Sequence, residues 1–287
     1  MSGPLRNEER RARLAAAWPV NVTKFAAAEC TSPGAIYRMA RELGLGTKPR
    51  KHPAKLGQKH KAIQGRTTRQ PKSIVSAKHS PRVLVPGSQN RKLGERVTKG
   101  KWAGLPIYQV TLIERASCPT SCAVWDRCYG NSMPFARRHI LDGELIKRLD
   151  VELDIAAARH RQGFLVRLHT LGDFGKDAAE ALPYIAFWRG KMAEIPGLHV
   201  FGFTAHGRDS AAGAAVMGLN RDFPDRCRIR FSGSASDDGF GAMVIESEAD
   251  SRHVVCPWEM ARAKKPANCG ACGLCWSMDR TVEFMEH

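Results

Sequence analysis

The sequence predicts an α/β fold of the partial (β/α)-barrel type with a cysteine-rich metal site near its C-terminal end, preceded by a small all-helical segment. Strand and helix signals alternate along residues 104–287, which favours parallel strands joined by crossover helices. Seven of the nine cysteines fall into two tight groups within that stretch. Residues 1–46 instead show only helical patterns. We therefore expect three parts, with residues 47–103 as a linker.

The first 46 residues predict three helices. Two span Asn7–Ala17 and Val22–Glu29, the second capped by Asn21. The third begins with Ser32 as its cap and Pro33 in its first turn, and carries apolar residues at helical spacing.

The second and third of these helices resemble a helix-turn-helix, in which the second helix enters the major groove of DNA. Its DNA contacts would be Ser32, Arg38 and Arg41. The alternative is an ordinary three-helix bundle that contacts protein.

Residues 47–103 form a basic segment that we interpret as a linker or extended arm, because five prolines interrupt it without sustained periodicity. Between Gly46 and Gly100 there are fifteen lysines and arginines and one acid, Glu95, which accounts for most of the net charge of +17. Such a segment favours a polyanionic partner, most plausibly DNA. The alternative is a solvated linker.

The α/β part is predicted from alternating apolar runs and amphipathic stretches. Strands are expected over Ile107–Ile113, Phe164–His169, His199–Thr204 and Arg228–Ser232, and helices over Asp142–Arg161, Asp177–Ile195 and Arg208–Leu219. Polar side chains follow several strand ends, where the sites of parallel sheets collect. His169 and Asp173 are the candidate catalytic pair among them, able to position a substrate or move a proton, unless they form only a polar turn.

The C-terminal cysteine group consists of Cys256, Cys269, Cys272 and Cys275. The spacing Cys269-x2-Cys272-x2-Cys275 with a remote fourth cysteine is typical of ferredoxin-type iron–sulfur clusters. Zinc sites more often use two separate cysteine pairs, so zinc is the alternative metal. This pattern makes residues 104–287 an iron–sulfur domain in our interpretation.

The Cys118 group consists of Cys118, Cys122 and Cys128 and follows the first predicted strand. Three cysteines leave one position of a [4Fe–4S] cluster open, and open positions are where metal chemistry occurs. A side chain could instead close the site; the candidates are Asp126, His139 and His169. A structural zinc site is the other interpretation.

Roughly residues 88–287 resemble the phage "gene product 88" family. The resemblance rests on Cys118-Pro-x2-Cys122 with Cys128-Tyr129, on the stretch Val166–Phe174, and on the C-terminal cysteine group. That family is distantly similar to radical S-adenosylmethionine enzymes, although their loop is C-x3-C-x2-C whereas here it is C-x3-C-x5-C. The resemblance implies a [4Fe–4S] cluster on the Cys118 group that binds S-adenosylmethionine, and an auxiliary cluster on the C-terminal cysteine group.

The sequence therefore predicts an iron–sulfur protein of radical type, of phage or prophage origin, that acts on nucleic acid. The alternative is a DNA-binding regulator whose metal–cysteine domain is structural or senses redox state. No apolar run is long enough to span a bilayer, and the cysteine usage suits a reducing compartment, so we expect a cytoplasmic protein with no membrane partner.

Overall fold

The computed structural model describes residues 4–18, 20–45, 55–260 and 267–286. The chain divides into two compact units, one ending at His52 and one beginning at Pro53. The predicted linker residues 47–54 lie outside the described residues.

The N-terminal unit contains three helices, α1 (Pro4–Ala17), α2 (Val22–Ala28) and α3 (Pro33–Glu42). They bury Leu14 and Ile36 in a small apolar core. The side chain of Asn21 accepts a hydrogen bond from the backbone N–H of Lys24 and so caps α2. These helices match the predicted ones to within a few residues.

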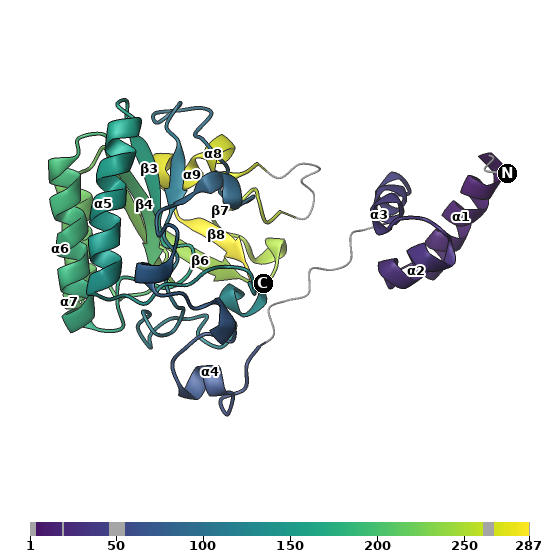
Figure 1. Ribbon diagram of the computed structural model, residues 1–287, viewed down its shortest axis with the longest axis horizontal. Coiled ribbons are helices and arrows are strands. Elements are labelled where there is room, and N and C mark those ends of the chain that lie inside the picture. The colour runs from purple at the N-terminus through teal and green to yellow at the C-terminus, as the bar shows by residue number, and fades with distance from the viewer. Residues whose placement is uncertain (1–3, 19, 46–54, 261–266, 287) are drawn as a thin grey trace. The chain divides into compact units, whose positions relative to one another are not determined.

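The larger unit is built on a mostly parallel sheet of eight strands in the order β1-β2-β3-β4-β5-β6-β8-β7. Its parallel strands follow the chain order from β2 to β6, as in a (β/α) barrel, and the sheet is open (Figure 1). The strands are β1 (Val85–Pro86), β2 (Ile107–Gln109), β3 (Phe164–Leu168), β4 (Leu198–Thr204), β5 (Cys227–Ser232), β6 (Gly241–Ile245), β7 (Val254–Val255) and β8 (Val282–Met285). The predicted α/β fold class is confirmed.

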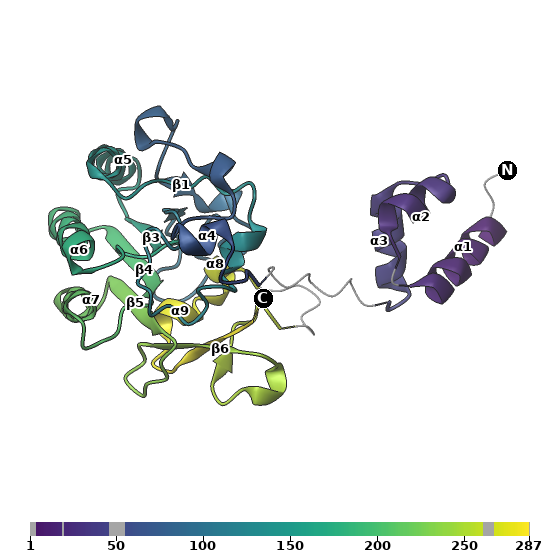
Figure 2. The same cartoon turned by 90° about the horizontal axis from the view of Figure 1, so that it is seen from below.

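Three helices cover one face of this sheet: α5 (Gly143–Arg159), α6 (Ala178–Glu194) and α7 (Ala211–Asp222) (Figure 2). Side chains from all three pack on alternate residues of β3, β4 and β5 in the main apolar core. Asp142, Asp177 and Ser210 cap the three helices by accepting backbone N–H groups.

The opposite face of the sheet carries α8 (Cys269–Cys272) and α9 (Leu274–Ser277) (Figures 1 and 2). A second apolar core forms there; its buried members are Leu93, Val97, Trp102, Leu105, Ile107, Leu165, Phe201 and Trp276. The sheet thus separates a helix-covered face from a face that bears the C-terminal cysteines.

Residues 55–103 pack into the larger unit, whereas we predicted a linker or arm. They include α4 (Lys61–Gln64) and short 3-10 helices at Pro71–Ser73, Ala77–His79 and Gly87–Gln89; others lie at Tyr129–Ser132 and Glu248–Asp250. The prediction was wrong because the prolines and the lack of a regular period suggested an extended segment. The segment nevertheless buries apolar side chains, such as Val83, Leu84 and Leu93, that follow no helical or strand period. Within the described residues, no helix is both long and apolar enough to cross a membrane.

Candidate metal centre

The four C-terminal cysteines come together from three short elements. Cys256 follows β7, Cys269 and Cys272 are the ends of α8, and Cys275 lies in α9. All four line one cavity, which Trp258 and Trp276 also border. Cys256, remote in the sequence, therefore lies near the three clustered cysteines.

Backbone pairing holds this segment against residues 92–98. The N–H of Cys269 donates to the Lys92 carbonyl (2.7 Å), and the N–H of Gly270 donates to the Leu93 carbonyl (3.0 Å). A Cβ at position 270 would lie 2.2 Å from the Arg96 carbonyl oxygen, so only glycine allows this approach. The segment that carries Cys269 and Cys272 is thus hydrogen-bonded to the end of the basic segment.

Burial raises the pKa of three of these thiols, those of Cys256, Cys269 and Cys275. Burial raises the pKa of Cys256 to about 11, and burial with the neighbouring cysteines raises the pKa of Cys275 further. Neighbouring thiolates repel one another, and a bound cation relieves this repulsion. The site is suited to a metal that displaces the thiol protons.

The sulfurs are spaced too widely for one small ion. In the described chain, no three cysteine sulfurs lie within 4.8 Å of one another. Four sulfurs bound to a single tetrahedral zinc at 2.3 Å would be about 3.8 Å apart. The observed spacing therefore differs from that of a mononuclear zinc site.

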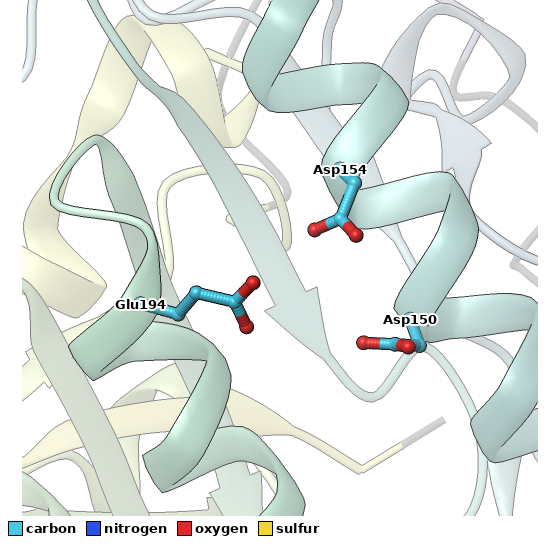
Figure 3. Close-up of side chains that lie close together, drawn as sticks. All are labelled: Asp150, Asp154 and Glu194. Atoms are coloured by element: carbon cyan, nitrogen blue, oxygen red, sulfur yellow. The ribbon is translucent and has the colours of Figure 1, made fainter.

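An acidic cluster elsewhere does have the spacing of an ion site. Asp150 and Asp154 of α5 and Glu194 of α6 point toward one another (Figure 3). The Lys191 ammonium already lies among them, at 2.9, 2.6 and 2.9 Å from their respective oxygens. Burial would lower the pKa of Lys191, but hydrogen bonds to these carboxylates raise it above its usual value. This cluster is an ion-pair network joining two helices.

The Cys118 group lies in the loop that leaves the carboxyl end of β2. Burial is the main reason that the pKa of Cys118 is raised, and Asp173, Cys122 and Cys128 raise it further. Burial also raises the pKa of Cys128 to about 12. The three cysteines are thus electrostatic neighbours, as the loop spacing predicts.

Two buried arginines shape this loop. Arg115 adopts a positive φ of 67° and donates to the carbonyls of Trp125 and Thr67 and to the Asn131 side chain. Arg138 forms a fully buried ion pair with Glu114 at 2.6 Å. These contacts, with those of Thr68 to Glu114 and of Arg138 to Ser73, tie the loop to residues 67–73.

Asp173 lies near the Cys118 group and acts electrostatically on Cys118 and Cys122. Its carboxylate accepts from the Thr204 hydroxyl (2.8 Å) and from the Ala205 N–H (2.6 Å), at the carboxyl end of β4. Burial raises the pKa of Asp173, while the nearby His206 and these hydrogen bonds oppose the rise. The side chain is a fixed, buried carboxyl group beside the sulfurs.

His169 does not join Asp173. Its ring stacks on Tyr184 of α6, with a 3.2 Å contact from Nε2 to the tyrosine hydroxyl. Burial lowers the pKa of His169 to about 3, so the ring is neutral at pH 7. Of the other candidate fourth ligands, His139 Nδ1 contacts the Val75 carbonyl, and Asp126, within the cysteine loop, pairs with Lys55.

Two residues near the cysteines were not predicted as site residues. Tyr129 is an electrostatic neighbour of Cys118, Cys128 and Arg167. Arg167 is in turn a neighbour of Cys269 in the other group. The sequence does hold one signal for Arg167: it is the single charged residue within the otherwise apolar strand Phe164–Leu168.

The predicted DNA-contact residues lie on α3 and its cap. The Ser32 hydroxyl accepts from the Ala35 N–H, so it caps the helix. Arg38 is exposed, and the side chain of Arg41 lies outside the described residues.

Comparison with protein-family models found no match, and comparisons with curated proteins and with solved structures found none either.

Proposed function

We propose that the protein is an iron–sulfur protein of radical type that acts on nucleic acid or a nucleotide, with one cluster on each cysteine group. The observation that carries the proposal is the gathering of Cys256, Cys269, Cys272 and Cys275 around one cavity. Its cysteine-only donor set suits iron–sulfur clusters, which are held by thiolates.

The sulfur spacing favours a cluster over zinc. A cluster places its own iron and sulfide atoms between the cysteine sulfurs, so it tolerates sulfurs farther apart than a single ion does. The absence of three cysteine sulfurs within 4.8 Å in the described chain agrees with this geometry.

The Cys118 group would hold the reactive cluster. When bound, a three-cysteine cluster supplies an open iron for S-adenosylmethionine and an electron for its cleavage. The chain's own contribution is to hold Asp173 and Tyr129 beside that position and to shield it from water. Asp173, raised in pKa by burial, could exchange a proton with a bound molecule. His169 could act only through the residues that it packs against, namely Phe174 and Tyr184.

The decisive experiment is metal analysis of protein purified without oxygen. We expect about seven to eight iron atoms per chain, with matching sulfide and a reduced-state EPR signal. Cleavage of S-adenosylmethionine by the reduced protein, lost in Cys118→Ala and retained in Cys30→Ala, would support the radical reaction. One or two zinc atoms per chain without visible colour would refute it.

A second candidate function is a DNA-binding regulator with a structural or redox-sensing metal domain. The N-terminal unit supports this, because α2 and α3 form a separately packed helix pair with Arg38 exposed. The full chain should then bind duplex DNA with an affinity that falls steeply as salt increases. Arg38→Gln should weaken binding, whereas Arg221→Gln on the exposed side of α7 should not.

A further inference from the structure

Arg167 is a buried cation that has no hydrogen-bond or ion-pair partner among the described residues. It is 8% exposed. Its Nε is shielded from solvent and has no partner among the described residues. The two terminal nitrogens remain accessible to solvent. A buried charge is costly unless an opposite charge or hydrogen bonds compensate it. The described part of the chain places no carboxylate within ion-pair distance of Arg167.

The neighbouring strand adds a second unpartnered donor. Gln109 of β2 is the register partner of Arg167, so the two side chains stand side by side on one face of the sheet. The Gln109 amide oxygen accepts from Asn90 (2.8 Å) and Thr170 (2.6 Å), which fixes the orientation of the amide. Its nitrogen donates to none of the described residues, although the side chain is only 6% exposed.

This donor pair lies between the two cysteine groups. Arg167 acts electrostatically on Tyr129, which neighbours Cys118 and Cys128, and on Cys269. On its other side lies Phe201, its register partner in β4. Two hydrogen-bond donors beside an aromatic ring and a hydroxyl are a recognition surface for an anionic group.

We infer that Arg167 and Gln109 bind an oxyanion, either a phosphate or a carboxylate, of the molecule that the protein acts on. The inference deepens the proposed function, on which the identity of that molecule rests. Arg167 presents its terminal nitrogens to the oxyanion, and the Gln109 amide donates beside them. The bound group would lie between the Cys118 group and the C-terminal cysteine group.

The test is calorimetric titration of the full chain, purified without oxygen, with four probes in two matched pairs. Deoxyadenosine monophosphate is compared with deoxyadenosine, and S-adenosylmethionine with its decarboxylated form. In one pair the member that carries the phosphate or carboxylate should bind more tightly than the member that lacks it, which identifies the bound oxyanion. Arg167→Gln should weaken that binding about tenfold to a hundredfold, to the level of the member that lacks the oxyanion.

Two further variants make the test sharper. Gln109→Glu keeps the acceptor for Asn90 and Thr170 but places a carboxylate beside Arg167. It should therefore abolish the tighter binding of the probe that carries the oxyanion while leaving the protein folded. The exposed Arg221→Gln is the matched control and should bind as the unaltered protein does.

The outcomes separate this inference from the proposed function. Equal affinities in Arg167→Gln and Arg221→Gln would overturn the oxyanion site, whatever metal the protein holds. A changed cluster reduction potential with unchanged affinity would also overturn it, since Arg167 would then balance the charge of the sulfurs. Zinc in place of iron would refute the proposed function, yet selective loss of binding in Arg167→Gln would still support the site.

Discussion

Buried charge around the Cys118 group is paired almost completely. Glu114 accepts from Arg138 and from the Thr68 hydroxyl, and Arg138 also donates to the Gly130, Met133 and Ala136 carbonyls. Arg138 therefore links Glu114, which precedes the cysteine loop, to the backbone that follows the loop. Arg138 contributes to stability mainly because its loss would leave the buried Glu114 carboxylate and these carbonyls without their hydrogen-bond donor.

We predict that Arg138→Met destabilises the protein by about 3–5 kcal/mol, because it leaves the buried Glu114 carboxylate uncompensated. Denaturant unfolding measures the change. Lys147→Met is the matched control: its pair with Glu144 is exposed, so the cost should be below about 1 kcal/mol. A cost for Arg138→Met no larger than that of the control would contradict the structural role of the pair.

The lowered pKa of His169 makes the stability of the protein depend on pH. Its folded-state pKa of about 3 lies below the value of 6.5 of an exposed histidine, so the unfolded chain binds more protons between these pH values. Stability should therefore fall as the pH drops below 6.5, by up to about 2 kcal/mol between pH 7.5 and pH 5.

The check is to compare unfolding free energies at these two pH values in the unaltered protein and in His169→Phe. The variant should lose less stability on acidification, because it lacks the titrating ring. An identical loss in both proteins would mean that other groups cause the acid sensitivity.

At the scale of elements, the C-terminal cysteines depend on a close backbone approach. Gly270 in α8 packs against the Arg96 carbonyl, and the Thr98 N–H donates to the Gly270 carbonyl at 2.9 Å. Helix α8 is only four residues long, so these contacts rather than its own hydrogen bonds position Cys269 and Cys272.

We predict that Gly270→Ala displaces α8 and reduces metal bound by the C-terminal cysteine group, while the Cys118 group keeps its metal. Metal analysis and EPR of the variant measure this. Gly190→Ala in α6 is the matched control, since its Cβ meets nothing within 4 Å, and it should stabilise the helix by up to about 1 kcal/mol. Full metal content in Gly270→Ala would show that α8 tolerates the shift.

At the scale of the whole molecule, the boundary between the units decides which fragments can fold. Residues 55–103 supply Leu93, Val97 and Trp102 to the core beside the cysteines, and the segment Lys92–Leu93 pairs with α8. A boundary at residue 103 would cut through that core.

We predict that a fragment of residues 53–287 folds and binds metal like the full chain, whereas a fragment of residues 101–287 does not. Thermal unfolding and metal content of both fragments test this. A cooperative transition in the shorter fragment would show that residues 53–100 are dispensable for the fold.

The sequence by itself determined the α/β class, the three helices of the N-terminal unit, and helices α5, α6 and α7 of the larger unit. Helical stripes, caps such as Asn21 and Asp142, and runs such as Phe164–Leu168 are local patterns, so they can be recognised without the fold. Strands β6 and β8 went unrecognised, because each is only partly buried and they pair with one another across a long stretch of sequence, which no local period encodes.

Only the tertiary structure decided which polar residues meet. His169 and Asp173 are four residues apart, yet one packs on α6 and the other lies beside Cys118. Arg167 and Gln109 are 58 positions apart and stand side by side, because β2 and β3 are neighbours in the sheet. The physical reason is that strand pairing and burial bring distant residues together, whereas sequence spacing describes only the geometry within one element.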